Sequence, residues 1–217
     1  MANRMTVAEL RTLVAARTAA RPRPSTGTVP TGVPALDDAL GGGLPAGQLT
    51  ELVSSVPGSG GQSVIARLLH ATRVSRQRVA LIDGADGFVP GCIPPDALRH
   101  LVWIRARGVE PALAAADILV RDGNYAVVVL DLRGLDERTL LQQPATIWHR
   151  LHHAAGVSAP AVLVQTTSPL VAAVPWRLVM SNALPFAVQD EAREALAARL
   201  VFETTRGHVQ AVDELTG

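Results

Sequence analysis

A glycine-rich stretch between residues 51 and 63 contains the residue types that bind phosphate groups. It reads Glu-Leu-Val-Ser-Ser-Val-Pro-Gly-Ser-Gly-Gly-Gln-Ser and stands between an apolar segment and a helical pattern. Loops of this kind use glycines to turn backbone N–H groups toward phosphates, a lysine as a mobile cation and a hydroxyl for Mg²⁺. The candidate nucleotide-binding residues in this stretch are Gly58, Ser59, Gly60, Gly61 and Gln62.

The side chains that catalyse phosphoryl transfer in such a loop are missing. All 20 residues counted as Lys or Arg are arginine, so no lysine is available. Ser55 replaces the first glycine, Gly61 stands at the lysine position and Gln62 stands at the hydroxyl position. Because phosphoryl transfer depends on electrostatic stabilisation by the missing groups, the sequence predicts a protein that does not hydrolyse ATP. Weak nucleotide binding by backbone N–H groups and a purely structural turn both remain open.

Apolar segments that alternate with helical patterns predict the elements that hold this loop. Parallel strands covered on both faces are indicated by near-continuous apolar runs at 49–53, 79–83, 101–105, 126–131 and 161–166. Helical patterns lie between them at 62–75, 109–122 and 136–155. Two later runs, 177–180 and 199–204, predict an antiparallel extension. The expected fold class is α/β, with a mostly parallel central sheet flanked by helices.

Composition and charge exclude several classes of protein. The chain has 217 residues, of which 48% are hydrophobic, enough for one α/β domain with a sizeable core. The formal net charge of +1 gives no overall reason to bind nucleic acid or an anionic membrane. A single cysteine, Cys92, cannot form an internal disulfide or a cysteine-based zinc site. We find no apolar run near the roughly 18 residues that span a bilayer and no signal-peptide core, so we expect a soluble cytoplasmic protein.

Residues 1–30 predict a short helix and a linker ahead of the main domain. An amphipathic helix over about 5–20 is indicated by apolar residues at helical spacing, namely Val7, Leu10, Leu13 and Val14. Its apolar face can dock on the protein's own core or bind a partner, and both remain open. The expected divisions are the N-terminal helix and linker at 1–30, a core at 31–205 and a tail at 206–217.

Several segments resemble the core of the RecA-like ATPases. Residues 31–51, Thr-Gly-Val-Pro-Ala-Leu-Asp-Asp-Ala-Leu-Gly-Gly-Gly-Leu-Pro-Ala-Gly-Gln-Leu-Thr-Glu, are similar to the short helix and glycine turn that enter that core. The resemblance places Asp131 at the magnesium-side aspartate and Gln165 at the glutamine that senses the γ-phosphate. Ala85 stands where that family has the glutamate that acts on the attacking water. Asp131 and Gln165 are therefore expected to be vestigial, and Asp83 and Asp86 to be solvated loop acids.

The two loops that bind DNA in the RecA family can be placed at 132–145 and 166–175. In the first loop the basic residues, Arg133 and Arg138, are offset by the acids at 136 and 137, and the second loop has no basic or aromatic residue. Single-strand binding requires basic grooves and stacking side chains. Direct DNA binding is therefore expected to be weak or absent.

Three histidines on one helix are the remaining possible metal ligands. His149, His152 and His153 share one side of the predicted helix beside Trp148. A transition-metal site needs further ligands and a second shell of hydrogen bonds, and the sequence identifies none. We expect no metal and no cofactor, and we expect these rings to form a helix surface or a partner contact. Near the end of the third strand, a packed Trp103 with exposed Arg105 and Arg107 is expected.

Within the RecA-like group the chain most resembles ImuA-type proteins. The shared features are a Pro-Gly-x-Gly loop without lysine, Leu-Val-Trp-Ile-Arg at 101–105, Leu-Val-Arg-Asp-Gly-Asn at 119–124 and Pro-Ala-Thr-Ile-Trp-His-Arg at 144–150. This resemblance implies a non-catalytic accessory protein of damage-induced translesion DNA synthesis. Its implied partners are an ImuB-like Y-family polymerase homologue and a DnaE-type error-prone polymerase, with segments 1–30 and 185–217 as candidate contact surfaces.

Two other functions remain open at this point. The first is a divergent ATPase in which an arginine such as Arg67 replaces the lysine, although Arg67 lies well down the following helix. The second is a modulator that binds RecA and caps or enters its filaments through the N-terminal helix.

Overall fold

The computed structural model of the protein describes residues 27–188 and 191–206. The helix predicted over 5–20, with Val7, Leu10, Leu13 and Val14, lies outside the described residues, as does the tail from 207 onward. Among the described helices, none combines the length and the apolar character needed to cross a membrane.

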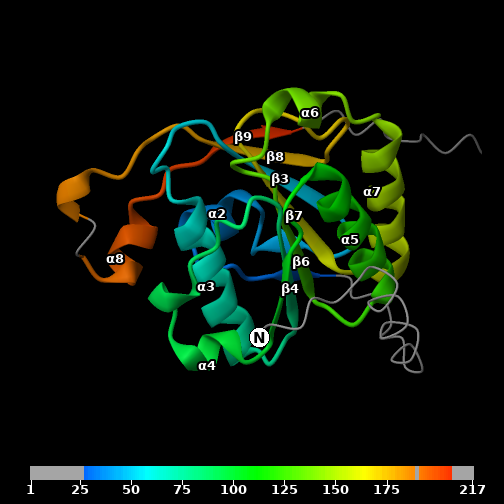
Figure 1. Ribbon diagram of the computed structural model, residues 1–217. Helices are drawn as coiled ribbons and strands as arrows, with labels where there is room; N and C mark the ends of the chain where they lie inside the picture. Colours follow the sequence, from blue (N-terminus) through cyan, green and yellow to red (C-terminus); the bar gives the residue numbers. More distant parts are fainter. Residues whose placement is uncertain (1–26, 189–190, 207–217) are drawn as a thin grey trace, which may run out of the picture.

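A seven-stranded sheet forms the centre of the fold (Figure 1). Its strands are β3 (Leu49–Ser54), β4 (Val79–Asp83), β5 (Leu101–Arg105), β6 (Val127–Asp131), β7 (Ala161–Thr166), β8 (Trp176–Met180) and β9 (Glu203–Arg206). Their order across the sheet is β5-β4-β6-β7-β3-β8-β9, and only β8 and β9 pair antiparallel. A separate antiparallel pair consists of β1 (Thr28–Val29) and β2 (Leu44–Pro45). The predicted α/β class with a mostly parallel sheet is confirmed.

Helices cover both faces of this sheet and make a three-layer arrangement (Figure 1). One face carries α2 (Pro34–Ala39), α3 (Gly61–Val74), α4 (Pro95–Leu98) and α8 (Arg193–Ala198), and the other carries α5 (Val109–Asp122) and α7 (Thr146–Ser158). Strand β6 illustrates why its sequence is apolar throughout. Val127 and Val129 pack in the core beneath α3, while Val128 and Leu130 pack in the core beneath α5 and α7. Side chains that alternate between two buried faces must all be apolar.

The helix predicted over 136–155 is in fact two helices, α6 (Glu137–Leu141) and α7. Pro144 lies between them, and a proline both lacks an N–H donor and keeps the preceding residue out of helical geometry. Asp136 begins α6 as its N-cap, accepting hydrogen bonds from the Thr139 backbone N–H at 2.9 Å and its hydroxyl at 2.7 Å. These hydrogen bonds to Thr139 hold the pKa of the Asp136 carboxyl below its usual value.

The predicted antiparallel extension is correct for β9 only, because β8 runs parallel to β3. The chain leaves β7 on one side of β3, passes over its end through residues 167–175 and returns on the other side. The buried carboxylate of Glu51 holds this crossover by accepting the backbone N–H groups of Leu170 at 2.7 Å and Val171 at 3.0 Å. The last strand also begins later than predicted, at Glu203, since residues 199–202 form the connection from α8.

We expect the fold to lose stability in mild acid because two of its histidines are half-buried. Burial lowers the pKa of His100, with Arg73 adding to the effect, and burial followed by the neighbouring His149 and His153 lowers the pKa of His152. As the pH falls through about 6.5, the unfolded chain takes up protons that the folded chain resists, so protonation favours unfolding. We expect the urea midpoint to fall between about pH 7.5 and about pH 5.5.

The histidine prediction is checked with a paired substitution. The double variant His100→Gln, His152→Gln should show a smaller fall in the urea midpoint over that pH interval than the parent protein. His70→Gln, which removes an exposed ring from α3, is the matched control. An equal fall in the urea midpoint of the parent and of the double variant would contradict the assignment of the acid sensitivity to these two histidines.

Candidate phosphate-binding site

The glycine-rich loop lies between the end of β3 and the start of α3, as a phosphate-binding loop does. Gly58 and Gly60 have φ values of 78° and 99°, a left-handed region that favours glycine, and Gly60 is the N-cap of α3. The loop lines an open cavity of about 680 Å³. The cavity is lined by residues 54–63 of this loop together with Arg133, Thr167, Leu184 and Leu196. All five candidate residues of the loop, Gly58 to Gln62, therefore meet at one cavity.

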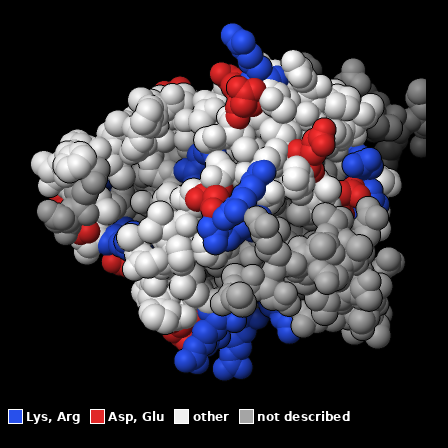
Figure 2. All heavy atoms as spheres, in the orientation of Figure 1, with Lys and Arg blue, Asp and Glu red and all other residues white. Residues whose placement is uncertain are grey.

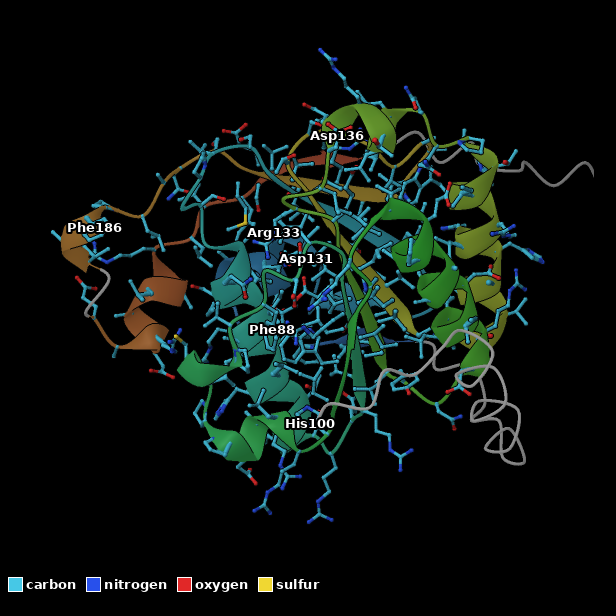
Figure 3. The ribbon with its side chains drawn as sticks, viewed as in Figure 1. Phe88, His100, Asp131, Arg133, Asp136 and Phe186 are labelled. Carbon is cyan, nitrogen blue, oxygen red and sulfur yellow. The ribbon has the colours of Figure 1, made fainter. Side chains whose placement is uncertain are left out.

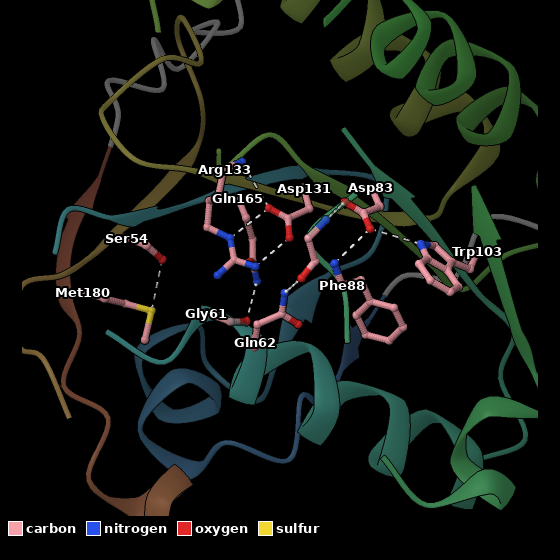
Figure 4. Close-up of polar contacts among 11 residues, drawn as sticks. Ser54, Gly61, Gln62, Asp83, Phe88, Trp103, Asp131, Arg133, Gln165 and Met180 are labelled. Carbon is pink, nitrogen blue, oxygen red and sulfur yellow. Dashed lines mark hydrogen bonds and ion pairs between the residues drawn. The ribbon is translucent and has the colours of Figure 1, made fainter. Parts of the chain in front are cut away.

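A cation is present at this loop, and it comes from Arg133 in the segment that follows β6. The Arg133 guanidinium binds the carboxylate of Asp131 through two hydrogen bonds, Nε to Oδ1 at 2.8 Å and Nη2 to Oδ2 at 2.6 Å (Figure 4). Asp131 is 4% exposed. A Cβ built on Gly61 would overlap Nη1 of Arg133. Glycine at the lysine position is thus what allows the arginine to lie against the start of α3.

Sequence reasoning missed the role of Arg133 and misassigned its partner. The arginine was expected to be offset by the acids at 136 and 137, but its partner is Asp131, and Asp136 is instead the N-cap of α6. Figure 3 shows Asp131 and Arg133 side by side above the start of α3. The combination that could have revealed the pair is an aspartate at a strand end, an arginine two residues later and a glycine where the loop would carry lysine.

Gln165 is held inside the protein and does not line the cavity. Its side chain is fully buried, and its Nε2 donates to the backbone carbonyl oxygen of Gly61 at 3.2 Å (Figure 4). Gln165 pairs in register with Asp131 on the neighbouring strand β6, and Gly61, the first residue of α3, lies against Gln165 and Arg133. Asp131, Gln165 and the loop are therefore brought together, as the resemblance implied, but Gln165 binds the protein itself.

Asp83 is a buried structural carboxylate, which corrects the expectation of a solvated loop acid. It is 1% exposed and accepts the backbone N–H groups of Gly87 and Phe88, both at 2.9 Å. The indole Nε1 of Trp103 donates to it at 3.3 Å, and the Phe88 ring meets the Trp103 ring edge-on at 5.2 Å between centroids (Figure 4). Gln62 reaches the same turn by donating to the carbonyl oxygen of Gly87 at 3.0 Å. These hydrogen bonds make Asp83 the centre of the turn after β4.

Asp86 is also engaged, because it forms ion pairs with Arg105 and Arg107. The hydrogen bond from Arg105 is the main reason that the pKa of Asp86 lies below its usual value. The Arg105 guanidinium lies 5.3 Å from the centre of the Trp103 ring, a cation–π contact. The expected packed tryptophan is present, and both arginines are exposed but paired with an acid.

The segment after β8 covers one side of the loop, a feature that the sequence did not predict. The backbone N–H of Leu184 donates to the carbonyl oxygen of Gly58 at 3.1 Å. A Cβ on Gly60 would overlap the side chain of Leu200, which is 2% exposed. Ser55 binds the same region, since its hydroxyl donates to the carbonyl oxygen of Met180 at 3.2 Å. The loop is therefore packed against the protein's own chain.

Other candidate ligands lie away from the cavity. Arg67 binds the carbonyl oxygen of Gly32 at 3.0 Å and Glu194 at 2.6 Å, so its guanidinium is not available to the loop. Within the described part of the chain, no group of three or more His, Cys, Asp or Glu side chains could hold a metal ion. Cys92 is exposed.

A parallel sheet between helical layers, with a glycine-rich turn from β3 to α3 and an aspartate at the end of β6, defines a RecA-like α/β core. The sequence is similar to RecA itself over about half of its length. Protein RecA of Frankia casuarinae is 38% identical over 116 residues, which cover 50% of this chain and 32% of that protein. Protein RecA of Salinispora tropica is 38% identical over 120 residues, 51% of this chain and 32% of that protein.

Protein RecA of Gluconobacter oxydans is 34% identical over 117 residues, which cover 51% of this chain and 33% of that protein. The chain thus spans about a third of the length of the curated relatives it matches. No family model matches the chain. This partial similarity and the fold together support a RecA-related protein of the RecA-like superfamily.

Proposed function

We propose that this chain is a non-catalytic, cytoplasmic RecA-like adaptor of a damage-induced translesion DNA synthesis complex. It binds an ImuB-like homologue of the Y-family polymerases, and a DnaE-type error-prone polymerase and RecA are further partners that this role implies. The observation that carries the proposal is the bidentate ion pair between Arg133 and Asp131. Asp131 is the carboxylate that would bind Mg²⁺ in an ATPase of this fold, and here it is neutralised by the protein's own cation.

The rest of the site supports a role without hydrolysis. The carboxylates on the strand ends nearest the loop, Asp83 and Asp131, are both buried and hydrogen-bonded within the protein. Gln165 binds a backbone oxygen of Gly61 instead of facing the cavity. Phosphoryl transfer requires a metal ion, a cation and a group that orients water, all free to meet the nucleotide. In this protein these groups are hydrogen-bonded to other parts of the same chain. The function we propose therefore uses the surface of the fold to bind partner proteins.

Co-purification tests the adaptor function directly. The full chain is co-expressed with an ImuB-like protein, and an affinity tag is placed on that protein. We expect the two proteins to elute together from size exclusion in a fixed ratio at moderate salt. Co-purification with tagged RecA but not with the tagged ImuB-like protein would instead indicate a modulator of RecA filaments. Separate elution of the full chain and the ImuB-like protein would contradict the proposal.

A divergent ATPase is the second candidate, and one observation favours it. The guanidinium of Arg133 lies against Gly61, so a cation does stand at the phosphate loop even though lysine is missing. Titration with ATP and Mg²⁺ decides between the two functions. Saturable hydrolysis that is abolished by Asp131→Ala would establish the ATPase and overturn the non-catalytic function.

A further inference from the structure

A second cavity of about 680 Å³ lies at the opposite end of the sheet from the phosphate loop, beside the first residues of β4 and β5. Four arginines line it, Arg73, Arg76, Arg78 and Arg99, and we refer to it as the arginine groove. Figure 3 places His100, another lining residue, at this end of the molecule, and Figure 2 shows basic side chains gathered there. The groove is separate from the candidate phosphate-binding site because parallel strands place their two ends on opposite edges of the sheet.

The groove carries an excess of positive charge. Arg73 and Arg99 share one carboxylate, that of Asp96, with nitrogen–oxygen distances of 3.0 Å and 3.7 Å. Arg76 and Arg78 are exposed, and within residues 27–188 and 191–206 neither forms an ion pair. Guanidinium groups that are free and close together bind oxyanions such as carboxylates through paired hydrogen bonds.

The backbone at Arg76 has a conformation that does not favour an arginine. Its φ of 57° lies in the left-handed region, at the turn that ends α3. Glycine is the residue that best fits this position, and a residue with a Cβ costs on the order of 1 kcal/mol there. The side chain makes no ion pair within the described residues that would offset this cost. A guanidinium kept at such a position is consistent with a role in binding.

An apolar hollow of about 360 Å³ adjoins the groove and shares Arg73 and Arg76 with it. Val74, Pro94 and Ala97 line this hollow, and Val74 is 74% exposed. An exposed aliphatic surface beside a row of cations matches a ligand that carries both acidic and apolar groups. Nucleic acid offers phosphates but no aliphatic side chain for such a hollow. Asp96 lines the hollow, and its carboxylate is already paired with Arg73.

We propose that the arginine groove and the adjoining hollow bind an acidic segment of a partner protein, with carboxylates on Arg76 and Arg78 and an apolar side chain against Val74. This inference rests on the adaptor function, since it specifies the chemistry of the partner. The groove recognises Asp or Glu side chains, and the hollow recognises an aliphatic or aromatic residue next to them. The contact is independent of the phosphate loop.

Selection from a random peptide library tests the groove. Displayed peptides of about 12 residues are selected on the full-length protein, and the enriched sequences are measured by fluorescence anisotropy. We expect an enriched pattern of acidic residues beside an apolar one. Arg76→Gly combined with Arg78→Gln should weaken binding at least about tenfold, and Val74→Asp should weaken it similarly. Arg76→Gly replaces the arginine with the residue that its backbone favours, so loss of binding would not reflect loss of folding.

Matched controls and alternative probes complete the test. Arg138→Gln combined with Arg193→Gln removes two exposed arginines elsewhere on the molecule and should leave peptide binding within about twofold. Selection of peptides without acidic residues, or equal binding by the groove variants, would overturn the proposal. Tighter, groove-dependent binding of a single-stranded oligothymidylate would also overturn it, in favour of a nucleic-acid site.

The groove and the adaptor function can fail separately. If the groove variants lose binding of acidic peptides and still co-purify with the ImuB-like protein as the parent does, the ImuB-like protein binds at another surface. In that case the groove is not the contact between the two proteins. If the parent protein fails to co-purify, the adaptor function falls, whatever the peptide results are.

Discussion

Glu51→Ala is expected to lower the free energy of unfolding by about 3–5 kcal/mol. Glu51 is fully buried on β3, and its carboxylate accepts the backbone N–H groups of Leu170 and Val171. It also forms an ion pair with Arg177 at 2.6 Å and accepts the hydroxyl of Thr166 at 3.3 Å. Removal of the carboxylate leaves a buried and a partly buried backbone N–H without their acceptor and a partly buried arginine without its partner. Thermal unfolding should show a decrease in Tm of about 10 °C.

The controls for Glu51 separate its charge from its shape. Glu51→Gln keeps an oxygen acceptor for the two N–H groups and removes the charge, so it should cost less, about 1–2 kcal/mol. Glu110→Ala removes an exposed glutamate from the first turn of α5 and should cost under about 1 kcal/mol. Limited proteolysis should detect faster cleavage within residues 167–175 in Glu51→Ala. If Glu51→Ala is as stable as Glu110→Ala, the Glu51 carboxylate does not hold the crossover.

Arg133→Ala is expected to destabilise the fold by about 2–3 kcal/mol and to create a metal site. The substitution leaves Asp131 buried without its cation, although partial exposure of the arginine side chain, 17%, moderates the cost. Two carboxylate oxygens then become available to a hard cation. In a thermal-shift measurement, Mg²⁺ at about 10 mM should raise the Tm of Arg133→Ala by about 3 °C and leave the parent protein unchanged.

Two further variants make the Arg133 result specific. Arg133→Ala combined with Asp131→Asn removes the carboxylate and should lose the response to Mg²⁺. Arg138→Ala removes an exposed arginine from the same connection and should resemble the parent protein in stability and in its lack of response. A rise in the Tm of the parent protein with Mg²⁺ would mean that Asp131 binds metal beside the arginine, and the observation behind the proposed function would be lost.

Strands and helices with uniform local patterns could be located from the sequence. The bounds predicted for 79–83, 101–105 and 161–166 agree with β4, β5 and β7, because apolar runs ended by turn residues leave few alternatives. The break between α6 and α7 was missed although Pro144 marks it, since the helical pattern on either side outweighed one residue. The direction of β8 was missed because it depends on Glu51, a residue distant in sequence.

The candidate site was predictable as a set of positions but not as a set of contacts. The loop, Asp131 and Gln165 meet as the resemblance implied, since the carboxyl ends of parallel strands share one edge of the sheet. The cover by Leu200 and the hydrogen bond from Trp103 to Asp83 depend on packing between segments far apart in the chain. The Arg133 pair is local in sequence, but it depends on the directions of two side chains, which the sequence pattern does not give. Charge counted along each loop gave the wrong partner for Arg133, because the nearest acid in space lies two residues before it.

The position of β3 within the sheet has a consequence during synthesis of the chain. β3 ends at Ser54, but its neighbours β7 and β8 begin only at Ala161 and Trp176. Until those residues leave the ribosome, the backbone donors and acceptors of β3 have no strand to pair with and its apolar side chains have no complete core. Unpaired strands of this kind are where nascent chains aggregate or bind chaperones. The order of strands therefore makes completion of this sheet a late event, which begins only after about three quarters of the chain has been made.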